Sequence, residues 1–289
     1  MSNPKEIKRR ILSIESVIKT TEAMKMISIV KLRKTKNLLI RIKNYLCYME
    51  SIFFDLFLKK NEKEIEENKF FLEKGKMKLF IIFTSDRGLC GSFNSLIFEK
   101  INYIFHKKKH EKYIFFSVGK KGFDFLCKKK KYDIYHKNWI GNSSSNLQIQ
   151  SFVSELIFDF LKEKFSSIYL IYNHLKKSLS QEIVIEKFLP IDSTNLNFQK
   201  KIPEISYILE PSRKRILNFL IPKFLNAKLL KIFWESITAE HTARMISMHK
   251  ATENAHDIQR NLILNYNKER QTTITKEILE IISGLESLK

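Results

Sequence analysis

The sequence predicts an α/β protein in which a small central α/β domain of the Rossmann-like type is joined to a long antiparallel coiled coil of N- and C-terminal helices. The chain breakers point to this arrangement first. Six of the seven glycines and four of the five prolines lie within residues 75–222, whereas residues 5–74 and 223–283 contain neither. A heptad-like apolar repeat near the N-terminus and short apolar runs in the centre support the same division. We therefore expect an N-terminal coiled-coil helix at 1–58, a central α/β domain at 59–210 and a C-terminal coiled-coil helix at 211–289.

The N-terminal arm repeats its apolar side chains at alternating intervals of four and three residues, which is typical of a coiled-coil seam. Eleven of the fifteen seam positions are apolar. Pro4 precedes the first turn, where a missing N–H costs least. The seam positions are Ile7, Ile11, Ile14, Ile18, Thr21, Lys25, Ser28, Leu32, Thr35, Leu39, Ile42, Leu46, Met49, Phe53 and Leu56.

The C-terminal arm carries a second apolar stripe, and its alanines would let another helix approach closely. Because both arms leave the same central domain, we expect them to pair with each other as an antiparallel hairpin of helices. Pairing between two chains has the same periodicity and stays open at this point. The stripe consists of Met245, Met248, Ala251, Ala255, Ile258, Leu262 and Tyr266.

The centre alternates strand-like and helix-like segments, which favours a largely parallel sheet covered by helices. Apolar, β-branched and aromatic runs predict four strands. Helices are expected at 95–105, directly after the GKKG turn, and at 147–163. The predicted strands are 77–84, 112–118, 166–173 and 182–190.

Composition narrows the possible partners. The 289 residues carry a net charge of +21, which favours nucleic acid, acidic lipid headgroups or acidic protein surfaces. The three cysteines form no CxxC pair and no disulfide framework. The N-terminal sequence lacks the features of a secretory signal, so we expect a bacterial-type cytoplasm. The histidine spacing matches no metal site, and no cofactor is expected.

The segment DRGLCG, at residues 86–91, follows a predicted strand and precedes a predicted helix. Its spacing matches neither GxGxxG nor the P-loop. We interpret it as a tight structural turn that needs Gly88 and Gly91. Cys90 has no local base or orienting group, so no catalytic residue is expected.

Three stretches of the arms do not fit an amphipathic helix with one buried apolar face and one solvent-exposed polar face. Residues 24–30, MKMISIV, place apolar side chains all round the helix, as do the final turns from residue 278 onward. Residues 268–273 are six consecutive polar residues between apolar turns. A surrounding sleeve of other subunits would explain all three.

The chain is similar to the gamma-subunit family of the F-type ATP synthase. The resemblance rests on EIKRRILSIESVIKTTEAMKMISIVKLRK, on SDRGLCGSFN and on the tail AEHTARMISMHKATENAHDIQRNLILNYNKERQTTITKEILEIISGLESL. It implies a rotor whose helices turn inside a ring of three alpha and three beta subunits. It further implies that the α/β domain docks on the membrane ring of c subunits together with the epsilon subunit. The chain would then be a non-catalytic subunit of a proton- or sodium-translocating complex, peripheral to the cytoplasmic face of the bacterial inner membrane.

The resemblance also implies roles for individual residues. Residues matching positions that face a beta subunit are Met24, Lys25, Arg244, Arg270, Gln271 and Thr275. Near the foot, Tyr207 and Glu210 match the segment that faces the c ring and epsilon. Arg270 suits a carboxylate partner because its planar group donates two parallel hydrogen bonds.

Two other interpretations start from the same residues. A basic coiled-coil protein that binds nucleic acid or has a structural role would explain the twelve Lys or Arg within residues 1–43. In such a protein the basic residues would act collectively, and Gln271→Ala would have no special effect. An enzyme built on the central domain would bind a nucleotide or metal as an isolated chain. The rotor interpretation predicts neither result.

Overall fold

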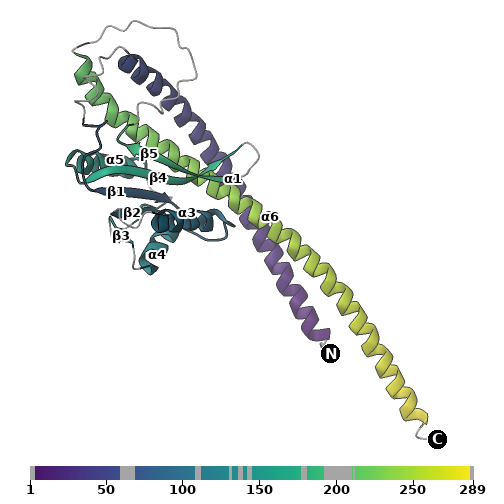
Figure 1. Ribbon diagram of the computed structural model, residues 1–289. Coiled ribbons are helices and arrows are strands. Elements are labelled where there is room, and N and C mark those ends of the chain that lie inside the picture. The colour runs from purple at the N-terminus through teal and green to yellow at the C-terminus, as the bar shows by residue number, and fades with distance from the viewer. Residues whose placement is uncertain are drawn as a thin grey trace. The chain divides into compact units, whose positions relative to one another are not determined.

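The computed structural model describes residues 4–58, 69–107, 112–129, 132–135, 139–141, 145–176, 181–191, 210 and 212–286. Two long helices, α1 (Pro4–Leu58) and α6 (Arg213–Glu286), enclose the rest of the chain in sequence (Figure 1). The chain forms two compact units. The coil unit comprises Met1–Val30 and Arg244–Lys289, and the sheet unit comprises Lys31–Ala243.

The sheet unit contains one five-stranded sheet in the order β3-β2-β1-β4-β5. Strands β1 to β4 are parallel, and β5 pairs with β4 in the antiparallel sense. The sequence predicted four of the strands and the largely parallel arrangement; it missed β3, which has only two residues. The strands are β1 (Met77–Phe83), β2 (Tyr113–Val118), β3 (Asp133–Ile134), β4 (Phe165–Leu175) and β5 (Gln181–Leu189).

Helices connect the parallel strands, as crossover connections require. The predicted helices at 95–105 and 147–163 correspond to α3 (Phe93–Lys107) and α5 (Asn146–Leu161), and the helix after GKKG is α4 (Lys120–Lys128). Helix α5 starts with a capping box, in which the Ser145 hydroxyl accepts from the Gln148 N–H and the Gln148 side chain accepts from the Ser145 N–H.

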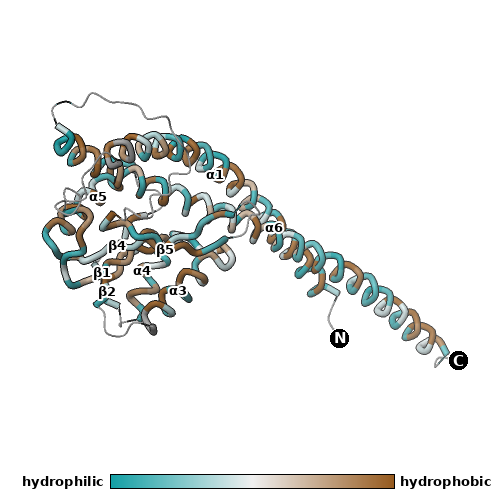
Figure 2. Tube along the Cα trace, turned by 45° about the horizontal axis from the view of Figure 1, so that its top comes forward, coloured by the Kyte–Doolittle hydropathy of each residue, from teal (hydrophilic) through white to brown (hydrophobic). Residues whose placement is uncertain are grey.

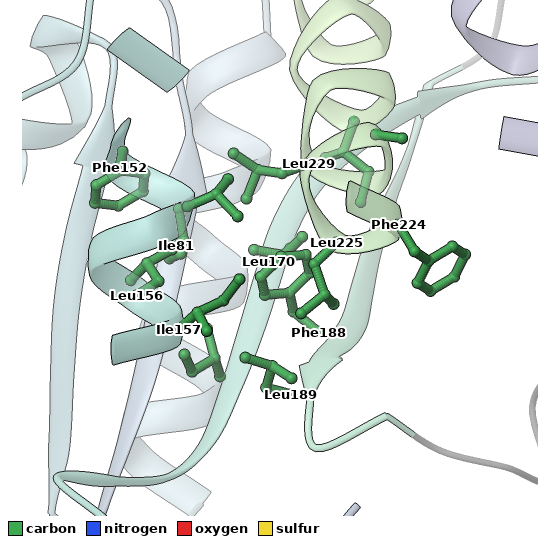
Figure 3. Packing of buried hydrophobic residues seen from close by; sticks show 14 of the residues in the cluster. Ile81, Phe152, Leu156, Ile157, Leu170, Phe188, Leu189, Phe224, Leu225 and Leu229 are labelled. Atoms are coloured by element: carbon green, nitrogen blue, oxygen red, sulfur yellow. The ribbon is translucent and has the colours of Figure 1, made fainter. Parts of the chain in front are cut away.

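The sheet has a hydrophobic core on each face, because successive strand residues point to opposite sides. On β1, Leu79, Ile81 and Phe83 contribute to one core, while Phe80 and Ile82 contribute to the other. The first core is closed by α5 and α6, and the second by α3 and α4. Figure 3 shows side chains of α5, β1, β4, β5 and α6 meeting in the first core.

Within the sheet unit, α6 is enclosed by the sheet and by α1. Phe53 of α1 is fully buried and stacks on Phe224 of α6, with ring centroids 5.2 Å apart. Helix α6 begins at Arg213 and contains Pro222. It therefore starts ten residues before the segment 223–283, which contains no glycine or proline. The missing N–H of Pro222 costs stability. Burial of Leu217, Ile221 and Leu225 around it offsets that cost.

The predicted α1 seam is confirmed. All fifteen seam positions are buried or half-buried, including the polar Thr21, Lys25, Ser28 and Thr35. The period-3.5 pattern therefore identified the inward face of α1 even where the side chain itself is polar. Burial at polar seam positions follows from the geometry of the helix rather than from hydrophobicity.

Candidate functional site

The coil unit consists of the first turns of α1 packed antiparallel against the last turns of α6 (Figure 1). Thr21 of α1 and Thr252 of α6 lie 2.9 Å apart, oxygen to oxygen, and Glu22 Oε1 lies 3.9 Å from His256 Nε2. The two arms therefore pair within one chain, as the first interpretation of the sequence expected.

Six of the seven predicted stripe positions in α6 are buried or half-buried, including Ala251, and only Ile258 is exposed. Two polar residues that the prediction left out, Thr252 and Gln259, are buried and half-buried. The observed face follows alternating steps of three and four residues, and the sequence interpretation chose apolar neighbours that leave this register. The face consists of Met245, Met248, Thr252, Ala255, Gln259, Leu262, Tyr266, Glu269 and Thr273.

Residues 24–30 of α1 expose apolar surface in several directions. Met26 and Val30 are 58% and 66% exposed, and Ile27 and Ile29 are exposed as well. Met24 and Lys25 are half-buried, and Ser28 is buried with its hydroxyl donating to the Met24 carbonyl at 2.8 Å. In the coil unit, α6 therefore covers only the seam, and the apolar side chains around it remain available to other molecules.

The polar run at 268–273 lies on the outside of α6 for most of its length. Arg270 and Gln271 are exposed, as is Thr275 one turn later. The Thr275 hydroxyl donates to the Gln271 carbonyl at 2.9 Å, and Thr272 and Thr273 likewise donate to carbonyls four residues earlier. The hydroxyls thus bond to their own helix, and the Arg270 and Gln271 head groups face outward.

The last turns of α6 extend past the N-terminal end of α1 within the coil unit (Figures 1 and 2). All of residues 274–286 are exposed. Six of these exposed side chains are large and apolar: Ile274, Ile278, Leu279, Ile281, Ile282 and Leu285. In the hydropathy colouring of Figure 2, hydrophobic turns reach almost to the C-terminus of α6.

Three other residues that the sequence analysis matched to subunit contacts lie away from the polar run at 268–273 and from the last turns of α6. Arg244 is half-buried in the coil unit, directly after the end of the sheet unit. Glu210 is exposed ahead of α6. Tyr207 lies outside the described residues.

Side-chain hydrogen bonds hold the turn between β1 and α3. Asn94 accepts from the Ser85 N–H at 3.0 Å and donates to the Ser85 hydroxyl at 2.7 Å and to Cys90 Sγ at 3.3 Å. Gly91 has φ 58°, which favours glycine. Gly88 has open space where a Cβ would stand and no positive φ, so the local geometry does not demand glycine there. Leu89 instead adopts the second left-handed conformation, with φ 63°.

The described part of the chain contains no cluster of three or more His, Cys, Asp or Glu side chains suited to a metal ion. Across the same residues, every helix is too short or too polar to traverse a lipid bilayer.

A five-stranded α/β domain combined with a two-helix antiparallel coil that exposes apolar side chains all round defines a shaft-like subunit of a larger assembly. The family described as ATP synthase matches residues 3–288. An ATP synthase gamma chain from Christiangramia forsetii is 37% identical over 100% of this chain and 99% of its own length. One from Geobacter metallireducens is 35% identical over the whole of both chains. The protein belongs to the ATP synthase gamma-chain family.

Solved structures agree on the fold. A chain of the Euglena gracilis mitochondrial ATP synthase, from a structure of OSCP, F1 and the c-ring in rotational state 3, superposes with a TM-score of 0.64 at 17% identity. The match covers 99% of this chain and 94% of that one. A rotor chain of the same enzyme in rotational state 1 has a TM-score of 0.63 at 18% identity, covering 94% of this chain and 98% of that one.

Proposed function

We propose that this chain is the central rotor shaft of an F-type ATP synthase, which couples rotation of the membrane c ring to ATP synthesis or hydrolysis at the beta-subunit sites. The observation that carries this proposal is the end of α6. Six large apolar side chains are exposed within residues 274–286, on turns that pass beyond the partner helix. Five of the six, at 274, 278, 281, 282 and 285, follow the spacing of one helix face and form a continuous exposed apolar stripe. An exposed apolar stripe of this length is typical of a surface that other molecules cover.

The surrounding molecules are three alpha and three beta subunits. Arg270 and Gln271 present outward donors just ahead of the apolar stripe of the last turns, and Thr275 steadies that turn through its bond to the Gln271 carbonyl. We assign these three residues, with Met24, Lys25 and Arg244, to contacts with beta subunits. Arg270 pairs with a carboxylate of beta through its planar guanidinium.

The mechanism is a differential interaction. A two-helix shaft is not threefold symmetric, so each of the three beta subunits meets a different side of it. A shaft shifts a site only by interacting differently with the conformations of that site. Directional hydrogen bonds from Arg270 and Gln271 supply such a difference. The apolar last turns of α6 make only non-directional contacts with the surrounding subunits, so they can rotate without breaking specific bonds.

The remaining assignments concern the opposite end of the subunit. We assign Tyr207 and Glu210 to the contact with the c ring and the epsilon subunit. The chain itself is non-catalytic, peripheral to the membrane through the c ring, and lies at the cytoplasmic face of the bacterial inner membrane. Its functional regions are 1–58, 59–210 and 211–289.

Reconstitution tests the proposal directly. The purified chain is combined with alpha and beta subunits, and ATP hydrolysis is measured with and without it. We expect the chain to co-purify with the ring and to raise hydrolysis well above that of alpha and beta alone. Equal hydrolysis in the two samples would refute the rotor assignment.

A further inference from the structure

Charged and hydroxyl side chains form a connected group in the sheet unit, where the β4–β5 edge of the sheet meets α1 and α6. The apolar pattern of the sequence gives no sign of this group. We call it the junction ladder, and it has two rungs. Its members are Lys43 and Glu50 of α1, Tyr172 and His174 of β4, Glu186 of β5, and Lys228, Lys231 and Glu235 of α6.

The first rung centres on Glu235, which is 2% exposed. Its Oε1 lies 2.8 Å from His174 Nδ1 and 3.5 Å from Lys43 Nζ. Its Oε2 is buried and has no hydrogen-bond partner among the described residues. One carboxylate of α6 therefore joins both the sheet and α1, and burial makes it depend on these two partners.

The second rung lies about two helical turns earlier on α6 and centres on Glu186. Glu186 Oε1 lies 2.8 Å from Lys228 Nζ, and the Tyr172 hydroxyl donates to Glu186 Oε2 at 3.0 Å. Burial would raise the pKa of the Glu186 carboxyl, but Lys228 and its neighbours outweigh it and hold that pKa below its usual value. Burial raises the pKa of the Glu50 carboxyl of α1, and the charges of Lys231 and Lys228 partly oppose that rise.

The spacing of these residues places the rungs on facing surfaces. Positions 228, 231 and 235 share one face of α6, and positions 43 and 50 are one heptad apart on α1. Tyr172 and His174 are two residues apart on β4 and so point to the same side of the sheet. The ladder thus links the sheet, through β4 and β5, to α1 and α6 at two levels along the helices.

Directional bonds resist a motion that apolar packing alone tolerates. Hydrophobic burial is non-directional, so a helix that slides along an apolar face exchanges one set of contacts for another. Sliding by one turn, about 5.4 Å, would instead separate Glu235 and Glu186 from their cations. Buried carboxylates without partners are strongly unfavourable.

We propose that the junction ladder is the joint that prevents the sheet from slipping along α1 and α6, so that torque applied to the α/β domain reaches the helices. Glu235, His174 and Lys43 are positioning residues in this role, since none of them touches a reacting group. This inference rests on the proposed rotor function. Its consequence is that a weakened ladder separates ATP hydrolysis from ion transport without stopping hydrolysis.

The test uses the complete ATP synthase reconstituted in lipid vesicles with this chain or its variants. ATP hydrolysis and ATP-driven ion uptake are measured on the same vesicles. For Glu235→Gln we expect the ratio of uptake to hydrolysis to fall at least about threefold, with hydrolysis within about twofold of wild type. The matched control is Glu163→Gln, which breaks the exposed pair with Lys74 elsewhere in the sheet unit and leaves the ratio unchanged.

Charge exchange separates a specific joint from general damage to the fold. Glu235→Lys alone is expected to lower the ratio, and adding Lys43→Glu is expected to restore at least about half of the loss, because the pair is reformed with opposite signs. If Glu235→Gln does not assemble, His174→Gln, on the half-exposed partner, is expected to give the same uncoupling. A normal ratio in the Glu235 or His174 variants, or an equal loss in the single and exchanged variants, would overturn the ladder. Failure of the wild-type chain to support any coupled uptake would instead overturn the rotor function.

Discussion

Two segments of the same helix, α6, have opposite environments. Residues 235–240 are all buried, although four of the six are polar or charged, whereas residues 274–286 are all exposed, although six are large and apolar. From hydrophobicity alone, residues 235–240 would be expected to be exposed and residues 274–286 to be buried. The comparison teaches that the first segment is enclosed by its own chain, while the second has a surface reserved for other chains.

Helix α1 repeats the contrast. Phe53, in the sheet unit, is fully buried against Phe224, whereas Val30, at the edge of the coil unit, is 66% exposed. The stability of the isolated chain should therefore come mainly from the sheet unit. Function should depend more on the coil unit.

The largest expected effect is on stability in the sheet unit. Phe53→Ala removes a buried ring and should lower the free energy of unfolding by about 3–5 kcal/mol. Tyr48→Ala, on the exposed side of the same helix, should change it by less than about 0.5 kcal/mol. Urea unfolding of the purified chain measures both. Similar losses for the two variants would show that burial against α6 does not set the stability of this part of α1.

The next effect is functional and belongs to the coil unit. Arg270→Ala should leave unfolding of the isolated chain unchanged, because Arg270 is exposed. In the reconstituted alpha–beta complex the same variant should lower ATP hydrolysis about tenfold, because the carboxylate of beta that we propose as its partner is then left unpaired. Lys268→Ala, in the same polar run, should stay within about twofold. A loss of stability in Arg270→Ala with normal hydrolysis would reverse our interpretation of this segment.

A smaller effect is expected within the coil seam. Thr21→Val or Thr252→Val alone removes the contact across the seam and leaves the other hydroxyl bonded only to a carbonyl of its own helix, Ile18 or Met248, so each should cost less than about 1 kcal/mol. Replacing both should be nearly neutral, because the two groups are then matched in shape and polarity. Unfolding of the two single variants and the double variant gives the coupling energy. Additive losses would show that the two hydroxyls do not interact in solution.

The smallest effect concerns pH and returns to the sheet unit. The folded-state pKa of Glu186 is depressed, so its contribution to stability is present above the pKa of the unfolded state and is lost as pH falls through the folded pKa. Glu186→Gln should therefore be less stable than wild type near pH 7, and the difference should shrink as the pH is lowered below about 4. Thermal unfolding across this range measures it. If the stability difference between wild type and Glu186→Gln grew as the pH fell, the folded-state pKa of Glu186 would be raised rather than lowered.

Much of the fold followed from periodicity. The fifteen-position seam of α1, four of the five strands and all three intervening helices agree with the sequence prediction to within a few residues. The exposed apolar turns near residues 24–30 and 278–286 also followed from counting apolar side chains around a helix. Thr252 and Gln259 were missed because a search for apolar stripes passes over polar side chains that occupy seam positions.

The junction ladder lay beyond the reach of the sequence for a different reason. Glu235 and Lys43 are 192 positions apart, and nothing local to either residue distinguishes it from a surface charge. The need for glycine at residue 88 was likewise a guess about backbone angles, and the structure places the left-handed conformations at Leu89 and Gly91 instead.

The order of apolar and polar side chains by itself determined the long helices, the strand positions and the turns that need other subunits around them. Local periodicity carries that information because helix and strand have fixed repeats. Only the tertiary structure decided which charged residues are enclosed and which partner each one meets. Burial depends on what the fold brings alongside a residue, and those neighbours come from distant parts of the chain.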